Sequence, residues 1–335
     1  MRAAVIVTPG QIAIETLPDP TPGPEDVVVR VAGGGICGTD LHILDGEFAP
    51  AYPIVPGHEF AGEIVAMGAD AGRLSPVKVG DQVAVDPSLH CHACYYCKRG
   101  RGNLCENWAA IGVTHPGGAA EFALVPARNC FPLPDGVNPA DAALIEPLSC
   151  AVRGFDVLPR QVADHYLIYG AGTMGLMMLE LAKRAGAASV SVVDLNPARL
   201  ETAKILGCSA AVTSADELTA PRGWDVVIDC TGAAAAIADG LGRVGKGGTF
   251  LQFGVANYDT RATIEPYKIY NQEITITGSM AVLHSFDRAG ELFASGLLDP
   301  QVFISHRFPL EQYAEAIAQF RAGVGRKIQI NPGSK

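Results

Sequence analysis

The segment His165-Tyr-Leu-Ile-Tyr-Gly-Ala-Gly-Thr-Met-Gly175 joins an apolar run to the glycine pattern G-x-G-x-x-G. The pattern alone is common, but here it follows a predicted strand and opens a predicted helix, which is the context of a dinucleotide-binding turn. Gly170 allows the tight turn, Gly172 lets the backbone approach a pyrophosphate, and Gly175 lets the helix pack on the strand. The segment therefore predicts a Rossmann-type, doubly wound parallel sheet.

Strands and helices alternate through the residues around this segment. The predicted strands are His165–Tyr169, Ser189–Asp194, Ala210–Thr213, Asp225–Cys230, Gly248–Gly254 and Glu273–Thr277, and the predicted helices are Thr173–Ala185 and Pro197–Leu206. The alternation is typical of βαβ units in a parallel sheet. Ala233–Ala236 indicates only a short helical run. We expect residues 151–280 to form the Rossmann NAD-binding domain.

An acidic residue follows the glycine pattern at the distance that dinucleotide sites use. Asp194 ends the next predicted strand, about 20 residues after the motif. A carboxylate there accepts hydrogen bonds from the adenosine ribose and repels a 2′-phosphate. Thr173 and Met174 begin the helix whose free N–H groups bind phosphate. The sequence predicts NAD as the cofactor, with Arg199 beside the adenine or on the helix surface. The alternative is a structural glycine turn with a capping aspartate.

The first 135 residues have a different sequence pattern, in which short runs rich in β-branched residues are separated by glycine and proline. They predict a mostly β domain because no long helical period occurs. Its expected strands include Ala3–Thr8, Ile12–Thr16 and Val27–Ala32, and a helix at residues 140–155 leads out of it. After Met280 the sequence predicts helices Phe286–Ala294 and Leu310–Ala322 and strands Ser305–Phe308 and Lys327–Ile330. We expect these strands to rejoin the first domain, which then spans residues 1–150 and 281–335.

Four cysteines are spaced C-x2-C-x2-C-x7-C at Cys91, Cys94, Cys97 and Cys105. Four thiolates complete a tetrahedral zinc shell and leave no open position, so this ion would stabilise the fold without taking part in chemistry. An iron–sulfur cluster is the main alternative, since C-x2-C-x2-C also begins ferredoxin motifs. In those motifs a proline follows the last cysteine, whereas Glu106 follows Cys105. The spacing favours structural zinc.

Length and composition limit the remaining possibilities. The chain has 335 residues, 48% of them hydrophobic, which is enough for two globular domains. The formal net charge of −10 argues against a nucleic-acid-binding surface. No apolar run is long enough for a membrane span, and the first residues predict a strand rather than a signal peptide. Nine cysteines without a secretory signal indicate reduced thiols, so we expect a cytoplasmic protein.

Three further pieces of sequence carry residues that can bind a metal. They are Gly35-Ile-Cys37-Gly-Thr39-Asp40-Leu-His42, Pro56-Gly-His58-Glu59-Phe and Ile145-Glu146-Pro-Leu. Each alone is ambiguous, because a lone cysteine is more often a small buried side chain and a lone histidine is usually not a ligand. Their combination beside a four-cysteine site and a dinucleotide site is informative.

With these motifs in this order, the sequence resembles the zinc-dependent medium-chain dehydrogenase family over nearly the whole chain. Gly80-Asp81 and Glu146-Pro-Leu-Ser149 add to the resemblance, which is greatest to the polyol branch with its sorbitol and other sugar-alcohol dehydrogenases. The resemblance implies an α/β protein with a GroES-like, mostly β catalytic domain and a Rossmann domain. It also implies an enzyme that transfers a hydride from a secondary alcohol to NAD and produces a ketose.

The resemblance further implies roles for the residues of the three pieces. Cys37 and His58 ligate a catalytic zinc, and Glu59, Glu146 or each in turn completes the protein ligands. The ion acidifies the substrate hydroxyl, and hydride passes to nicotinamide. Thr39 takes the proton and His42 passes it to solvent. Asp40 orients His58 from behind. The role-bearing residues are Cys37, Thr39, Asp40, His42, His58, Glu59 and Glu146.

The substrate is less well defined than the chemistry. Polyol dehydrogenases often carry an arginine just after the last Rossmann strand, but Gly278-Ser-Met-Ala-Val-Leu-His284 has none. We therefore expect a sugar alcohol other than sorbitol, such as a pentitol or hexitol of different configuration, or a cyclic polyol. Candidate substrate contacts are Glu47, Phe48, His115, Met280 and His284. Threonine-type or simple-alcohol oxidation is the alternative within the family. A non-catalytic NAD-binding regulator is the alternative outside it.

The last Rossmann strand, Glu273–Thr277, predicts self-association. In this family that strand commonly pairs with its counterpart in another subunit, and an unpaired edge would otherwise invite uncontrolled association. We expect a homodimer or homotetramer, with a small molecule as the other partner and with neither nucleic acid nor membrane involved.

Overall fold

A computed structural model describes residues 1–47 and 51–333 of the chain. It divides into two compact units. The first unit contains residues Met1–Ser149 and Val282–Lys335, and the second contains Cys150–Ala281. These boundaries lie within two residues of the ones that the sequence indicates.

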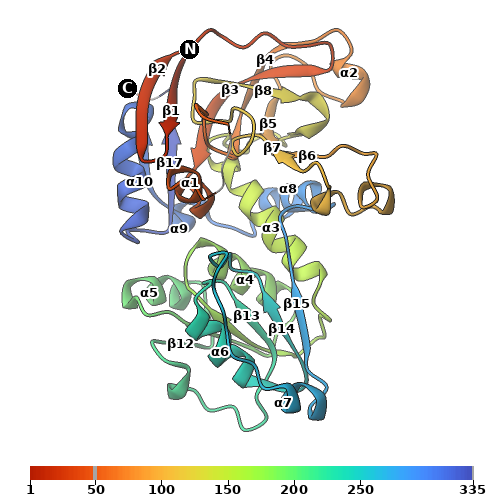
Figure 1. Cartoon of the computed structure of the whole chain (residues 1–335), viewed down its shortest axis with the longest axis vertical. Coiled ribbons are helices and arrows are strands. Elements are labelled where there is room, and N and C mark those ends of the chain that lie inside the picture. Colours follow the sequence, from red (N-terminus) through yellow and green to blue (C-terminus); the bar gives the residue numbers. More distant parts are fainter. Residues whose placement is uncertain (48–50, 334–335) are drawn as a thin grey trace. The chain divides into compact units, whose positions relative to one another are not determined.

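A seven-stranded sheet forms the centre of the first unit, with the order β16-β17-β3-β4-β5-β9 and β8 paired to β3. Its strands are β3 (Asp26–Gly35), β4 (Glu59–Met67), β5 (Gln82–Val85), β8 (Phe122–Pro126), β9 (Cys130–Pro132), β16 (Ile304–Pro309) and β17 (Lys327–Asn331). The two strands near the end of the chain, blue in Figure 1, thus join strands from its first third. Their return to this unit, which the sequence predicts, is confirmed.

Two small antiparallel pairs and five short helices complete the first unit. The pairs are β1 (Arg2–Thr8) with β2 (Gln11–Thr16) and β6 (Ser88–Leu89) with β7 (Ala109–Ala110). The helices are α1 (Gly38–Leu44), α2 (Ala71–Leu74), α8 (Phe286–Ala294), α9 (Pro300–Phe303) and α10 (Tyr313–Arg321). One apolar core lies around β1, α1, α10 and β17, and a second lies between β3, β4, β5 and β8.

The second unit is built on a six-stranded sheet whose strands are all parallel, in the order β12-β11-β10-β13-β14-β15. The strands are β10 (His165–Tyr169), β11 (Ser189–Val193), β12 (Ala210–Val212), β13 (Trp224–Asp229), β14 (Val244–Gln252) and β15 (Thr275–Gly278). The helices are α3 (Ile145–Asp156), which begins in the first unit, α4 (Thr173–Arg184), α5 (Pro197–Ile205), α6 (Ala234–Arg243) and α7 (Pro266–Asn271). Figure 1 shows these elements in green to blue.

Alternate residues of β10 show that helices cover both faces of this sheet. Tyr169 packs in one core cluster with Ile237 of α6. Ile168 points to the other face, because successive strand residues alternate, and it lies against the start of α4 at Gly175. The predicted doubly wound fold is therefore confirmed.

The structure corrects two details of the sequence interpretation. The alanine run at residues 233–236 is not a minor feature, because Ala234 begins the ten-residue helix α6. Ile237 and Leu241, one turn apart, pack against the sheet and extend that helix beyond the alanines. Residues 140–155 are not one helix, since a 3-10 turn at Asp141–Leu144 precedes α3. No helix in the described part of the chain is long and apolar enough to cross a membrane.

Candidate metal and cofactor sites

Strand pairing brings the first group of predicted ligands together. Gly35, the last residue of β3, lies directly opposite Glu59, the first residue of β4. Cys37 follows β3 and caps the N-terminus of α1, whereas His58 immediately precedes β4. One ligand atom from each of Cys37, His58 and Glu59 lies within 4.8 Å of the others. Cys37 is half-buried and the other two side chains are buried, so the group combines a thiol, an imidazole and a carboxylate.

Asp40 lies behind this group and is fully buried. Its Oδ2 accepts the backbone N–H of Cys37 at 2.8 Å, and its Oδ1 accepts that of Gly57 at 3.3 Å. Oδ1 is also 3.9 Å from Nδ1 of His58, which is too long for a hydrogen bond. Burial raises the pKa of Asp40. Asp40 thereby ties the backbone at Cys37 to the backbone at Gly57, the residue before His58.

The electrostatics of His58 reflect its anionic neighbours. Burial alone would lower its pKa, but the hydrogen bond and charge of Cys37, together with Asp40 and Glu146, raise it well above the usual value. Nδ1 of His58 is buried and makes no hydrogen bond with any described residue. A buried imidazole surrounded by acids favours a bound cation, either a proton or a metal ion.

Glu146, at the start of α3, is buried and electrostatically coupled to the same group. Burial raises its pKa to about 7, His58 lowers it, and Glu59 raises it. Among the described residues, the group within 4.8 Å nevertheless contains Glu59 and not Glu146. The arrangement thus makes Glu59 the nearer carboxylate for a metal on Cys37 and His58.

Lys327, the first residue of β17, is a functional candidate that sequence reasoning missed. Its side chain is buried, and its Nζ donates to both carboxylate oxygens of Glu59, at 2.8 and 2.6 Å, and to the carbonyl oxygen of Ile36 at 3.1 Å. Burial lowers the pKa of Lys327, but Glu59 and Cys37 outweigh that effect and raise it. A lone lysine opening an apolar strand, Lys327-Ile-Gln-Ile, was the only signal in the sequence.

Helix α1 also carries the two predicted proton-transfer residues. Thr39 and His42 are three residues apart, so they are neighbours on one side of the helix. The hydroxyl of Thr39 lies 3.9 Å from the sulfur of Cys37. Nδ1 of His42 lies 2.5 Å from a carboxylate oxygen of Glu47, and the ring remains partly exposed. Glu47 can therefore hold the orientation of the imidazole.

The four predicted structural ligands, Cys91, Cys94, Cys97 and Cys105, form the second group with ligand atoms within 4.8 Å. Backbone N–H groups of Cys91 and Asn107 point to the sulfur of Cys105, at 3.4 and 3.3 Å. Further N–H groups point to the sulfurs of Cys91 and Cys94, at 3.4 and 3.5 Å. Such donors stabilise thiolates, and backbone hydrogen bonds lower the pKa of Cys91 to about 6.

Both groups fit zinc. The four-cysteine group offers a complete tetrahedral shell and is suited to a structural ion. The Cys37–His58–Glu59 group offers three protein ligands and can leave a fourth position for a small molecule, as catalytic zinc sites do. A mixed set of thiol, imidazole and carboxylate donors suits a borderline-soft ion such as Zn²⁺.

The predicted cofactor residues meet at the carboxyl ends of β10 and β11. Gly170 follows β10 with a φ of 101°, a conformation that glycine adopts readily. Gly172 caps α4, and a Cβ placed on it would touch nothing within 4 Å, so there is open space beside the helix N-terminus. Oδ2 of Asp194 accepts the N–H of Ala171 at 2.7 Å, and its Oδ1 accepts that of Asn196 at 2.8 Å. Asp194 is thus hydrogen-bonded to the glycine loop at Ala171.

The remaining cofactor candidates occupy the first turns of two helices. Thr173 and Met174 begin α4 and are half-buried, whereas Gly175 is buried against the strand. Arg199 lies in the first turn of α5, also half-buried. The free N–H groups of α4 and the space beside Gly172 fit a pyrophosphate group.

Three of the predicted substrate contacts form hydrogen bonds with other residues of the chain. Glu47 pairs with His42, His115 contacts the hydroxyl of Thr114 at 3.1 Å, and His284 contacts the carbonyl of Gly100 at 3.2 Å. Met280 is partly exposed. Phe48 lies outside the described residues.

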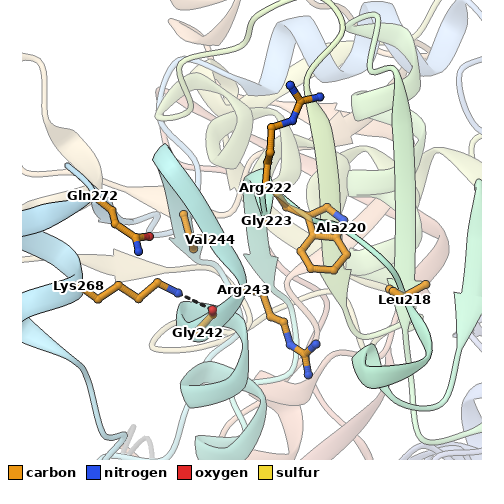
Figure 2. A pocket seen from close by; sticks show the side chains of 10 residues that line it. Leu218, Ala220, Arg222, Gly223, Gly242, Arg243, Val244, Lys268 and Gln272 are labelled. Carbon is orange, nitrogen blue, oxygen red and sulfur yellow. Dashed lines mark hydrogen bonds between the residues drawn. The ribbon is translucent and has the colours of Figure 1, made fainter.

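A cavity of about 280 Å³ opens in the second unit near the amino-terminal ends of β13 and β14. Figure 2 shows the side chains of Arg222 and Lys268 among those that line it, with Lys268 donating to the carbonyl of Gly242. No predicted site residue lines this cavity. The predicted cofactor residues follow the carboxyl ends of the strands, so the cavity lies at the opposite edge of the sheet.

Comparison with known proteins assigns both units. Residues 23–135 match the alcohol dehydrogenase GroES-like domain, and residues 173–295 match the zinc-binding dehydrogenase domain. The chain is 36% identical to D-arabinitol dehydrogenase 1 of Uromyces fabae, over 92% of this chain and 90% of that protein. It is 35% identical to L-threonine 3-dehydrogenase of Saccharopolyspora erythraea, over 99% of each.

A solved structure extends the likeness to three dimensions. The crystal structure of a putative zinc-binding dehydrogenase from Sinorhizobium meliloti 1021, bound to NADP, matches with a TM-score of 0.95 and 32% identity over 99% of both chains. These findings confirm the predicted GroES-like and Rossmann architecture. The chain belongs to the zinc-dependent medium-chain dehydrogenase family, in its polyol dehydrogenase branch.

Proposed function

We propose that this enzyme oxidises a secondary hydroxyl group of a sugar alcohol to a ketone, with NAD as the hydride acceptor and zinc at Cys37 and His58. The proposal rests above all on one observation. A thiol, an imidazole and a carboxylate lie within 4.8 Å of one another at the N-terminus of a helix that carries Thr39 and His42. An NAD-binding regulator would have no use for this combination of ligands and hydroxyl.

Zinc at this site would supply Lewis acidity, which lowers the pKa of a bound hydroxyl toward neutrality. The chain's residues perform the remaining tasks. Thr39, whose hydroxyl is 3.9 Å from the sulfur of Cys37, can accept the proton that the substrate loses. His42, one turn further along α1, can receive that proton and release it from its partly exposed ring. Asp40 holds the backbone at Cys37 and at Gly57, next to His58, and so helps to keep both ligands in place.

The second unit would hold the cofactor through its backbone more than through its side chains. The N–H groups at the start of α4 bind the pyrophosphate, and Gly172 lets it approach closely. The carboxylate of Asp194 already braces the loop through Ala171, and a carboxylate has acceptor capacity left for ribose hydroxyls. Its negative charge opposes a 2′-phosphate, so we propose NAD in preference to NADP.

L-Threonine is the second candidate substrate, because an L-threonine 3-dehydrogenase matches this chain over its full length at 35% identity. A polyol is favoured by the match to a D-arabinitol dehydrogenase at 36% identity. The segment after β15 lacks the arginine that polyol dehydrogenases often use, so we propose a pentitol or hexitol other than sorbitol.

A panel of pentitols, hexitols, inositols and β-hydroxy amino acids, assayed by NAD reduction, tests the proposal. We expect activity on one or more sugar alcohols, with two zinc ions per chain by elemental analysis. The test variant is Cys37→Ser, which should lose one ion and the activity. Its matched control is Cys130→Ser, which changes a buried cysteine outside both ligand groups. Activity on threonine alone would support the second candidate. A chain with one zinc and no oxidation of any alcohol would refute the enzymatic proposal.

Strand β15 supports self-association, which we propose as a homodimer or homotetramer. It is the last strand in the sheet order and pairs only with β14 among the described residues. Ile276 within it and Tyr267 and Tyr270 of the preceding α7 are exposed. Light scattering at the mass of a single 35.0 kDa chain would contradict this proposal. A cytoplasmic location stays a prediction.

A further inference from the structure

The ion pair between Lys327 and Glu59 is buried, and none of the roles assigned above uses the lysine. Both side chains are buried, with exposed fractions of 4% for Lys327 and 1% for Glu59. An ammonium group has three N–H donors, and here all three have acceptors: the two oxygens of Glu59 and the carbonyl of Ile36. The pair is therefore a fully satisfied contact, directly beside the Cys37–His58 group.

The backbone is shaped to accept this pair. Lys327 begins β17 and Glu59 begins β4, and these two strands flank β3 on opposite sides. Gly35, at the end of β3, lies between them. A Cβ on Gly35 would lie 2.0 Å from Oε2 of Glu59 and 3.2 Å from Cδ of Lys327. The missing side chain is thus what allows the lysine to reach the carboxylate across the middle strand.

We propose that Lys327 is a positioning residue that shares the carboxylate of Glu59 with the metal and thereby limits how tightly the Cys37–His58 site holds its ion. This inference rests on the proposed zinc site. A carboxylate that neutralises an ammonium group gives less of its charge to a nearby cation, and the buried ammonium repels that cation directly. The open ligand position then stays accessible to substrate, because Glu59 is not free to move fully onto the metal.

Removal of the lysine charge should release the carboxylate. In Lys327→Met, Glu59 is a buried anion that has lost its ammonium partner, and a metal ion at Cys37 and His58 is well placed to compensate its charge. The metal should therefore bind more tightly and with a firmly attached carboxylate. Gly35→Ala should act in the same direction without changing any charge, since its Cβ displaces Glu59 from the lysine.

A double-mutant cycle measures this coupling directly. The variants are wild type, Lys327→Met, Glu59→Gln and Lys327→Met/Glu59→Gln, the last of which removes both charges together and leaves neither one buried alone. Each is loaded with zinc and exposed to a chelator, and the rate of zinc loss from the weaker site is followed. Retention by the four-cysteine group is the internal control. Gly34→Ala is the matched control for Gly35→Ala, because its Cβ makes only ordinary contacts, at 3.5 Å or more.

We expect Lys327→Met to slow zinc loss by about tenfold or more when Glu59 is present and by much less in the Glu59→Gln background. Gly35→Ala should also slow it, whereas Gly34→Ala should not. Equal effects of Lys327→Met in both backgrounds, or faster zinc loss in the single variant, would overturn the role of Lys327 while leaving the zinc site intact. A wild-type chain that holds metal at the four-cysteine group alone would overturn the proposed function as well.

Discussion

Replacement of two glycines of the same motif by alanine should have different effects, one on stability and the other on cofactor binding. A Cβ on Gly175 would lie 1.8 Å from the carbonyl oxygen of Gly170, whereas real Cβ contacts stay above 3.0 Å. Helix α4 would have to move away from β10 by about 1.2 Å, because the obstacle is backbone and cannot rotate away. Overpacking costs about 1–3 kcal/mol, and alanine regains up to about 1 kcal/mol of helix propensity. We expect Gly175→Ala to destabilise the second unit by about 2 kcal/mol.

Gly172→Ala should leave stability nearly unchanged but weaken cofactor binding. Its Cβ meets nothing within 4 Å and its φ of −74° suits alanine. The cost of replacing a glycine cap by alanine, about 0.5–1 kcal/mol, should be offset by a gain of about 0.4–1 kcal/mol, because alanine restricts the unfolded chain. The same Cβ would occupy the space into which a pyrophosphate fits, and NADH affinity should fall by about tenfold or more, or about 1.4 kcal/mol.

Urea denaturation and NADH fluorescence titration separate the two effects. The expected result is a lower unfolding midpoint for Gly175→Ala and a weaker titration at wild-type stability for Gly172→Ala. The reasoning is refuted if Gly172→Ala binds NADH as well as wild type does, or if Gly175→Ala unfolds at the wild-type midpoint.

Four further predictions concern the metals, the pH dependence and the choice of cofactor. Cys37→Ser should lower turnover by about a thousandfold or more and remove one zinc per chain, because Lewis acidity contributes several kcal/mol to such reactions; wild-type turnover would contradict this. Cys105→Ser should lose the other zinc and render residues 91–105 sensitive to limited proteolysis, since two N–H groups depend on that sulfur; resistance equal to wild type would argue against a structural ion. With the Cys37–His58 site free of metal, the raised pKa of Glu146, about 7 against a usual 4.5, means that the folded chain binds more protons than the unfolded chain between these values. The free energy of unfolding should therefore fall as pH rises from about 5 to 7, and the fall should be shallower in Glu146→Gln, as chemical denaturation at each pH can test. Asp194→Ser should raise kcat/KM with NADP relative to NAD by about tenfold or more; a wild-type preference for NADP would contradict the role of Asp194.

The sequence predicted those features that depend on local patterns. The parallel strands around the glycine motif and the four-cysteine group carry fixed spacings, so their composition could be inferred before any coordinates. The Cys37–His58 pair was expected from the resemblance to a family, because no local spacing connects its members. The extent of α6 was underestimated, because Ile237 and Leu241 gain their meaning only against the sheet that they cover. Local reasoning treats an alanine run as a minor feature when its apolar partners lie elsewhere in the chain.

The identity of the nearer carboxylate and the role of Lys327 could not be predicted in the same way. The choice between Glu59 and Glu146 depends on which ligand atoms lie together, and that follows from the pairing of β3 with β4. Lys327 is far from Glu59 in sequence, and its relevance follows only from the position of β17 beside β3. Gly35, which lets the two side chains meet, resembles any other glycine in a glycine run.

The position of β17 also constrains how the enzyme can be made in the cell. Cys37, His58 and Glu59 leave the ribosome well before the strand that bears Lys327, because Lys327 lies 268 residues after Glu59. The Rossmann unit is an insertion between them and can fold while the sheet of the first unit still lacks an edge. Until β17 has been synthesised, Glu59 lacks its Lys327 partner, so a metal ion that arrives during synthesis would meet a different set of charges from the one in the folded protein.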